Sequence, residues 1–480
     1  MGPHFFRQTW TASAVMLTMI GQGMMLSYTS ALLPALQKPD SDIKADLNTA
    51  SWLASLGGLA GVPGFLISST LMEVYGRKLA HLLVLVPGAI GWLAIYFAQD
   101  IPTLMVGRTL GGITAGATVT LGAIVIGEYT SPSLRGVFLT LKTVAVSFGG
   151  MLVHVLLHFV SWRTIALVSI IPCVSAMLVI CTWTESPAWL ASKGEFEKSK
   201  KAFLYLRGDS EASLKEINDC IKAQMDRLST PKVKKPLISD VVDFFQKFTK
   251  RDFVMPLFII VVGTTLLEAS GRHIFPAYAL QIVNEVTGDV SHSLYYTLGM
   301  DILITTSAIL SSVLIKIMNR RTLLFSTGFF AVAVIMAACT YLALAENGVI
   351  SNDRPWIPMV IFVAFFISAN LGCTPVPLTL LGEVFPLAHR AVGSALSGAW
   401  LSLAVMVGYQ VTPYLLINIK LYGAFFVFGA TMGITLLILY FILPETKDKT
   451  LQEIENYFNF GKYADDKEKD KEANVKMVKS

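Results

Sequence analysis

Long apolar runs separated by short polar segments fill most of the 480-residue chain. A hydrocarbon core about 30 Å thick needs about 20 predominantly apolar residues per crossing helix. Runs of that kind begin near residues 11, 50, 79, 102, 137 and 163, and again near residues 253, 293, 322, 355, 391 and 420. The pattern predicts an all-α membrane protein with twelve transmembrane helices.

A longer polar segment separates the two sets of six runs. Within it, "KGEFEKSKKAFLYLRG" alternates charged and apolar residues at helical spacing, which predicts amphipathic helices. We therefore divide the chain into an N-terminal six-helix bundle at 1–183, a linker with amphipathic helices at 184–252, a C-terminal six-helix bundle at 253–443 and a tail at 444–480.

Composition and charge placement agree with a protein that crosses a bilayer several times. Only 15% of the residues are charged and 54% are hydrophobic, whereas a soluble domain has about 25% charged residues. Basic residues gather in the segments on one side of the predicted spans, which predicts a cytoplasmic linker and two cytoplasmic termini in the cell membrane. These residues include Arg7, Arg77, Lys78, Arg135, Arg320, Arg321 and Arg390.

Several classes of function are not expected. The five cysteines form no disulfide or metal-binding pattern, so we expect no metal or cofactor. The glycine-rich motif "GRTLGG" lies inside a predicted span and not after a strand, and no nucleophile stands with a base, so we expect no enzyme. The expected partners are a small-molecule substrate and the lipid bilayer, not a nucleic acid.

Short motifs recur in the two halves of the chain. Glu128 stands seven residues before Arg135 in "EYTSPSLRG", and Glu383 stands seven residues before Arg390 in "EVFPLAHRAVG". The motif "YGRK" at 75–78 corresponds to "MNRR" at 318–321, and "TESP" at 184–187 corresponds to "PETK" at 444–447. Two similar six-helix repeats are typical of transporters, because a site between them can be exposed to either side by rocking.

Together these motifs resemble the sugar porter family of the major facilitator superfamily, and within it the insect trehalose and hexose facilitators. The resemblance covers nearly the whole chain. The motifs that carry it are "YGRK", "GRTLGG", "GEYTSPSLRG", "TESPAWL", "NRRTLL", "PVP", "GEVFP" and "PETKDKTLQEI". The resemblance implies a major facilitator fold, a chain that works as a monomer, and transport of trehalose or a hexose by alternating access.

The resemblance also implies a cytoplasmic gate of arginines and carboxylates. Guanidinium and carboxylate groups form planar bidentate pairs, which suit a latch at the helix ends. The matching residues are Arg77, Arg108, Glu128, Arg135, Glu185, Arg320, Arg321, Glu383 and Arg390. This sequence departs from the family pattern at Lys316, where an acid is expected, and at Asn319, where a glycine is expected.

A sugar site needs amide and hydroxyl groups among aromatic and apolar walls. The family's amide-rich segment in span 7, aligned on Ser270 and Gly271, places Leu267, Glu268 and His273 where amides are expected. Other family positions fall on threonines, an asparagine and aromatic residues. The candidate substrate-binding residues are Thr143, Glu268, His273, Tyr278, Thr305, Asn370 and Trp400.

Ionisable residues in the spans keep the mechanism open. Thr29 or a neighbour stands where the family's symporters have an acid, which favours facilitative uniport. Against this stand Glu268, His273 and Asp301, with His154 and His158 in span 5. Glu268 and Arg272 are four residues apart, which places them on one helix face, where they form a shielded pair, a ligand site or a charge relay. The alternatives are a proton-coupled or facilitative carrier of another small polar metabolite, and a non-transporting nutrient sensor of the same fold.

Overall fold

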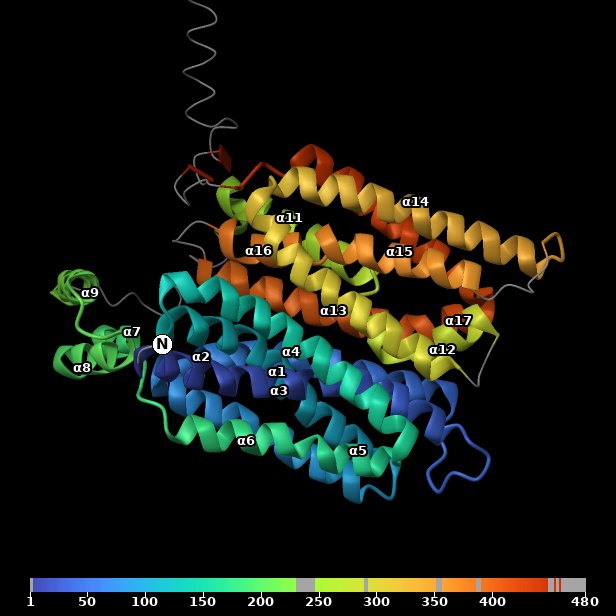
Figure 1. Cartoon of the computed structure of the whole chain (residues 1–480), viewed down its shortest axis with the longest axis horizontal. Helices are drawn as coiled ribbons and strands as arrows, with labels where there is room; N and C mark the ends of the chain where they lie inside the picture. Colours follow the sequence, from blue (N-terminus) through green and yellow to red (C-terminus); the bar gives the residue numbers. More distant parts are fainter. Residues whose placement is uncertain are drawn as a thin grey trace, which may run out of the picture.

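The computed structural model describes residues 3–229, 247–288, 292–350, 356–385, 390–447, 453–454 and 457–458. Among these residues the regular elements are all helices, and Figure 1 shows them running alongside one another in a long bundle. The prediction of an all-α fold is confirmed. The last residues of the predicted tail, 459–480, lie outside the described residues.

Six helices form the first half of the bundle. They are α1 (Pro3–Leu36), α2 (Leu47–Phe97), α3 (Ile101–Tyr129), α4 (Pro132–Phe159), α5 (Trp162–Val168) and α6 (Ile170–Cys181). The long helix α2 contains two spans, because the chain turns at Gly76, whose φ of 86° suits only a glycine. Helices α5 and α6 meet at Ser169 and together make one span.

The second half contains a short 3₁₀ turn and seven helices. They are η1 (Lys247–Thr249), α11 (Arg251–Ala269), α12 (Ile274–Thr287), α13 (Ser293–Ile317), α14 (Arg320–Glu346), α15 (Trp356–Gly372), α16 (Pro375–Glu383) and α17 (Arg390–Ile442). Helix α17 contains two spans and turns at Lys420, which has a φ of 59° and pairs with Glu346. Two spans are interrupted, between α11 and α12 and between α15 and α16.

The number of spans agrees with the prediction of twelve. In the part of the chain that the structure describes, nine stretches are long and apolar enough to cross a membrane. Two of them, α2 and α17, each contain two spans, and α1 with its 34 residues adds one more. Helix α1 begins at Pro3, earlier than the predicted start near residue 11, and the other spans start within a few residues of the predicted apolar runs.

Three helices of the linker pack under the first half. They are α7 (Pro187–Ser192), α8 (Phe196–Arg207) and α9 (Glu211–Ser229), and Figure 1 shows them beside the N-terminus. The Gln8 side chain donates to the carbonyl of Leu206 at 3.1 Å, and Arg207 donates to the carbonyl of Thr130 at 2.8 Å. We call this end of the bundle the linker end and the other end the distal end.

Carboxylates mark two helix starts at the distal end. Asp46 accepts the backbone N–H of Thr49 at 3.0 Å and caps α2, and Asp100 accepts the N–H of Thr103 at 2.9 Å and caps α3. These hydrogen bonds hold the pKa of both carboxyl groups below its usual value, because they favour the ionised form.

Glycines allow α1 and α4 to approach closely. A Cβ atom added at Gly23 would lie 1.9 Å from the carbonyl oxygen of Val146, and one added at Gly149 would lie 2.1 Å from the carbonyl oxygen of Ile20. Small residues at such crossings are how membrane helices gain packing contacts without a hydrophobic driving force. The close crossing fixes how α4 faces the second half.

Replacing one of these glycines tests the packing. We expect Gly23→Ala to lower the free energy of unfolding by about 1–3 kcal/mol, because the added methyl forces α1 and α4 apart. The matched control is Gly21→Ala on the same helix, where no atom lies within 4 Å of the added Cβ. That control should keep or raise the midpoint of thermal unfolding in detergent, since alanine favours a helix by about 1 kcal/mol over glycine. Equal midpoints for the two variants would contradict the close crossing.

Candidate functional site

A cavity of about 40 Å³ lies between the two halves. Its wall is built from α1 and α4 of the first half and from α12, α13 and α15 of the second. Phe275 and Phe366, whose ring centroids are 4.5 Å apart, form part of the apolar wall. The polar residues of the lining are Ser27, Ser147, Arg272, Asp301 and Asn370.

Two hydroxyl groups of the lining have no hydrogen-bond partner. The Oγ atoms of Ser27 and Ser147 are buried, and neither bonds to any group in the described part of the chain. A buried polar atom without a partner is unfavourable by about 1–3 kcal/mol, so such groups are rare unless a ligand or water completes them. The cavity therefore offers hydroxyl groups from both α1 and α4 to a polar ligand.

The interruption of span 7 places Arg272 at the cavity. Helix α11 ends at Ala269, and Gly271 has a φ of 81°, which interrupts the helix before α12 begins. A Cβ at Gly271 would lie 3.1 Å from the ring of Phe366, so a glycine suits this turn in both conformation and space. Irregular backbone at membrane depth is tolerated where it lines a cavity.

The same turn contradicts the prediction that Glu268 and Arg272 share a helix face. The helix ends between the two residues, so they do not share a helix face. The Oε1 atom of Glu268 instead lies 2.6 Å from Nδ1 of His273, and the two side chains form a buried pair across the turn. The expectation failed because a spacing of four has its helical meaning only in a continuous helix.

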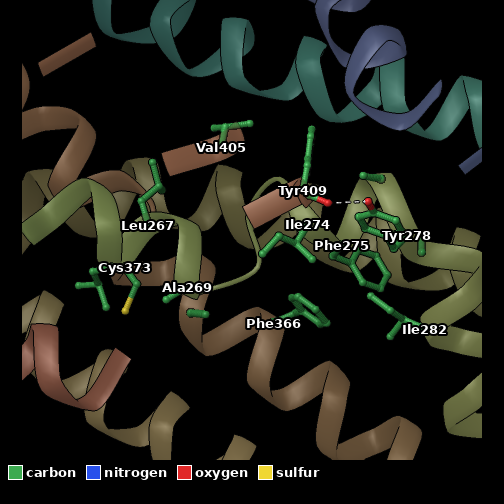
Figure 2. Close-up of a cluster of buried hydrophobic side chains, with 14 of the residues drawn as sticks. Leu267, Ala269, Ile274, Phe275, Tyr278, Ile282, Phe366, Cys373, Val405 and Tyr409 are labelled. Atoms are coloured by element: carbon green, nitrogen blue, oxygen red, sulfur yellow. Dashed lines mark hydrogen bonds between the residues drawn. The ribbon is translucent and has the colours of Figure 1, made fainter. Parts of the chain in front are cut away.

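Aromatic and aliphatic side chains hold the turn in place. Figure 2 shows Leu267, Ile274, Phe275, Tyr278 and Tyr409 gathered around the break. The Tyr278 hydroxyl donates to the carbonyl of Tyr409 at 2.9 Å, and the Tyr409 hydroxyl donates to the carbonyl of His273 at 3.2 Å. These bonds tie α12 to α17, so the position of Arg272 and Phe275 depends on packing within the second half.

Of the seven candidate binding residues, Asn370 lines the cavity. Its amide donates to the carbonyl of Phe366 at 2.8 Å, and its oxygen accepts from Thr374 at 3.3 Å. Glu268 and His273 lie in the turn beside the cavity and bond to each other. Tyr278 is buried against Tyr409.

The other three candidates lie apart from the cavity lining. Thr143 stands one turn before Ser147 on α4 and bonds to the carbonyl of Leu139. Thr305 bonds to the carbonyl of Asp301 at 2.7 Å. The indole of Trp400 is 3.4 Å from the Thr265 hydroxyl. Whether any of the seven contacts a substrate stays a prediction.

Sequence reasoning did not select Ser27, Ser147, Arg272 or Asp301 as cavity residues. Arg272 and Asp301 are ionisable residues inside predicted spans. Such residues often mark a substrate or ion pathway, so this signal could have identified them as cavity residues. The two serines gave no such signal, because hydroxyl residues in membrane helices are often packing residues.

Three of the predicted gate residues of the first half, Arg77, Glu128 and Glu185, form one cluster at the linker end. Arg77 donates to both oxygens of Glu128, from Nε at 2.8 Å and from Nη2 at 2.7 Å. The carboxylate of Glu185 accepts the backbone N–H groups of Arg77 at 2.8 Å and of Lys78 at 3.2 Å. A Cβ at Gly76 would lie 2.4 Å from Glu185, so the glycine of "YGRK" leaves room for this carboxylate.

The second half repeats this arrangement. The carboxylate of Glu445 accepts the backbone N–H groups of Arg320 and Arg321, each at 3.0 Å. The Nη1 atom of Arg77 donates to the carbonyl five residues earlier, that of Met72, and Nη1 of Arg320 likewise donates to Ile315. Asn319 takes the place of the glycine with an ordinary φ of −63°. In each half the arginine motif therefore contacts the acidic motif that follows the last span.

Arg108 was also predicted as a gate residue, but it does not belong to this cluster. Arg108 is buried near the distal start of α3, about 30 Å along the helix from Glu128. Its guanidinium donates to the Thr29 hydroxyl at 3.0 Å and to the carbonyls of Met25 and Leu53. Arg135 stays near the cluster and donates to the carbonyl of Gly127 at 2.6 Å. The side chains of Glu383 and Arg390 lie outside the described part of the structure.

Hydrogen bonds join the two halves toward the distal end. Ser55 on α2 donates to Gln410 on α17 at 2.7 Å, and Tyr414 donates to Asn48 at 3.3 Å. His154 on α4 bonds to Asp301 on α13 at 2.7 Å. In contrast, the bonds of Arg77 and Glu128 stay within one half. These hydrogen bonds between the halves thus lie on the distal side of the cavity.

The carboxylate of Glu185 provides a test of the linker-end cluster. We expect Glu185→Ala to lower the free energy of unfolding by about 2–3 kcal/mol, because hydrogen bonds to a charged group are lost. The matched control is Glu195→Ala, which removes an exposed ion pair with Lys198. For the control, thermal unfolding in detergent should show that the free energy of unfolding falls by only about 0–1 kcal/mol. A Glu185 variant as stable as the control would show that the cluster does not hold the half together.

The chain is similar to known carriers over most of its length. The sequence profile of a family described as "Sugar (and other) transporter" matches residues 18–458. The facilitated trehalose transporter Tret1 of Culex quinquefasciatus is 25% identical over 451 residues, which cover 94% of this chain and 85% of the relative. Tret1 of Polypedilum vanderplanki is also 25% identical, over 94% of this chain and 88% of its own length.

The fold is similar to that of solved sugar carriers. The inward open conformation of the xylose transporter XylE from E. coli superposes with a TM-score of 0.74 at 17% identity, over 94% of this chain and 99% of that chain. The partially occluded inward open conformation of XylE gives 0.73 at 16% identity, over 93% and 99% of the two chains. These matches show that the twelve spans have the major facilitator arrangement.

Proposed function

The chain belongs to the sugar (and other) transporter family, and on that premise we propose that it carries trehalose or a hexose across a membrane by facilitative alternating access. The relatives that it matches are named as facilitated trehalose transporters, and they cover 94% of this chain. A member of this family moves its substrate through the bundle, so no enzymatic step is needed.

One observation carries the proposal: the cavity between the two repeats offers neutral hydrogen-bonding groups beside aromatic walls. Ser27 and Ser147 supply hydroxyl groups without partners, and Asn370 supplies an amide. Phe275 and Phe366 supply the rings. A sugar needs many neutral hydrogen bonds, and its C–H face packs on aromatic rings. A site between two repeats is also where alternating access operates.

The surroundings of Arg108 support uniport. The family resemblance places an acid of span 1 in proton-coupled members at or near Thr29. In this chain Arg108 bonds there to the neutral Thr29 hydroxyl and to backbone carbonyls. A hydroxyl group stands where a carboxylate could take up and release a proton beside the guanidinium. We therefore propose that the substrate gradient alone drives transport.

We also propose the cell membrane as the location, with the linker end in the cytoplasm. Arg77, Arg320 and Arg321 lie at that end together with the linker helices, in agreement with the positive-inside rule. In this orientation the Arg77 and Glu128 cluster belongs to the cytoplasmic gate. One chain contributes both walls of the cavity, which supports function as a monomer.

A second candidate is a carrier of a small charged metabolite. The observation that favours it is that Arg272 and Asp301 both line the cavity. A guanidinium at the wall would bind a carboxylate or phosphate group of a ligand strongly. The two candidates differ in whether charge on the substrate is required.

Counterflow into proteoliposomes separates these functions. We expect unlabelled trehalose or a hexose inside the vesicles to accelerate entry of the same labelled sugar, with no accumulation when an inward proton gradient is imposed. Competition with glucose, fructose, trehalose and a sugar acid identifies the preferred class. Counterflow of the sugar acid alone would favour the charged metabolite, and sugar accumulation driven by protons would exclude uniport. Binding without any counterflow would indicate a sensor.

Two positions on α4 test which side chains meet the sugar. We expect Ser147→Ala to raise the apparent KM for counterflow roughly two- to tenfold, the effect of losing one hydrogen bond of about 0.5–1.5 kcal/mol. The matched control is Thr143→Val, one turn earlier and outside the cavity lining. The opposite result, a raised KM for the Thr143 variant only, would move the binding site along α4 and contradict the cavity as the site.

A further inference from the structure

His154 lies between two hydrogen-bond acceptors from the second half. Its Nδ1 is 2.7 Å from Oδ2 of Asp301 on α13, and its Nε2 is 3.2 Å from the carbonyl oxygen of Pro276 on α12. His154 itself belongs to α4 of the first half and is fully buried. One imidazole therefore links the two halves through both of its nitrogens.

The hydrogen bonds determine how many protons the pair holds. A carbonyl oxygen only accepts, so Nε2 carries the hydrogen that points to Pro276. Then Nδ1 either donates a second hydrogen to an ionised Asp301 or accepts one from a protonated Asp301. Both arrangements contain one proton more than a neutral imidazole beside an ionised carboxylate. Both also leave the buried pair without net charge, which burial strongly favours.

The position of the pair connects this proton to the movement of the halves. His154 is about 8 Å from the distal end of α4, and Asp301 is about 12 Å from the distal start of α13. Asp301 also lines the central cavity. If the halves rock apart at the distal end, α4 separates from α13, and water from the cavity reaches both side chains.

Other titratable and charged side chains lie in the distal half of the bundle. Among them are Tyr28, Arg108, His158, Arg163, Arg272, Glu285 and Tyr296. Arg272 lines the same cavity as Asp301.

We propose that His154 and Asp301 form a proton-binding site that is complete only while the distal end is closed, so that distal closing takes up a proton and distal opening releases it. This inference goes beyond the proposed sugar transport, because it concerns the equilibrium between two conformations and holds for any substrate. It is also compatible with uniport, since a proton that returns to the same side drives no accumulation.

The sign of the pH dependence follows from the proton count. In water an imidazole is mostly neutral and a carboxylate is ionised above about pH 6.5. The open state then holds one proton fewer than the closed state. Raising the pH above about 6.5 therefore favours the open state, by up to about tenfold per pH unit while the closed pair keeps its proton.

Distances across the distal end test the proposal without a substrate. Spin labels are placed at Lys44→Cys and Asn347→Cys, two exposed positions in distal loops of the two halves. The full-length chain also carries Cys181→Ser and Cys220→Ser, because these are the cysteines that are not buried. In nanodiscs at pH 6, 7 and 8, we expect the population with the longer distance to grow with pH.

Variants assign the effect to the pair. In Asp301→Asn the extra proton cannot be held, because a protonated imidazole would be buried without a counter-charge, so we expect the distance distribution to be independent of pH. The matched control is His158→Gln, an exposed histidine one turn further along α4, which should keep the pH dependence.

Three results would overturn the proposal: a wild-type distribution that does not change with pH, growth of the long-distance population at low pH, or an unchanged pH dependence in Asp301→Asn. If a variant fails to fold, the pH dependence of the distances in the wild-type protein still tests the proposal. Failure of the transport proposal remains distinguishable, because counterflow could be absent while the distances still respond to pH.

Discussion

In a bilayer, a buried polar group without a partner is unfavourable, and this constraint shapes the centre of the molecule. Span 7 stops being a helix at Gly271, and the turn that replaces it lines a cavity where polar backbone is tolerated. Oε1 of Glu268 pairs with Nδ1 of His273 across the turn, while Oε2 of Glu268 is buried without a partner among the described residues. Arg272 and Phe275 are thereby left facing the space between the halves. The position of the cavity wall follows from this interruption.

The two halves have similar internal contacts, but the hydrogen bonds between them lie toward one end of the bundle. Within each half a carboxylate from the end of the last span, Glu185 or Glu445, accepts the backbone of an arginine motif. Between the halves the hydrogen bonds described above lie toward the distal end, at Ser55 and His154. Strong bonds within each half and few bonds between them allow the halves to move as rigid bodies. That is the mechanical requirement for alternating access.

The sequence predicted the large features and missed the local ones for physical reasons. Span length, repeat motifs and linker helices follow from apolar runs and charge spacing, and the structure agrees with them. The break at Gly271 was not predicted, because a single glycine in an apolar run can adopt either a helical or a positive φ. Arg108 was grouped with the linker-end gate, although Asp100 and Pro102 mark the start of its helix only two turns earlier and so place it near the distal end. Ser27 and Ser147 can be recognised as candidate binding residues only from the structure, which places both in the lining of one cavity.

The central claim is that transport requires the halves to separate at the distal end. The most direct measurement introduces Ser55→Cys and Gln410→Cys, at side chains that bond across the halves at 2.7 Å, and joins them with a short bis-methanethiosulfonate cross-linker, whose disulfide bonds a reductant cleaves. Counterflow is then measured before cross-linking, after it, and after reduction. The account predicts that cross-linking stops counterflow and that reduction restores it, while each single cysteine variant is unaffected. Full counterflow in the cross-linked protein would contradict the account.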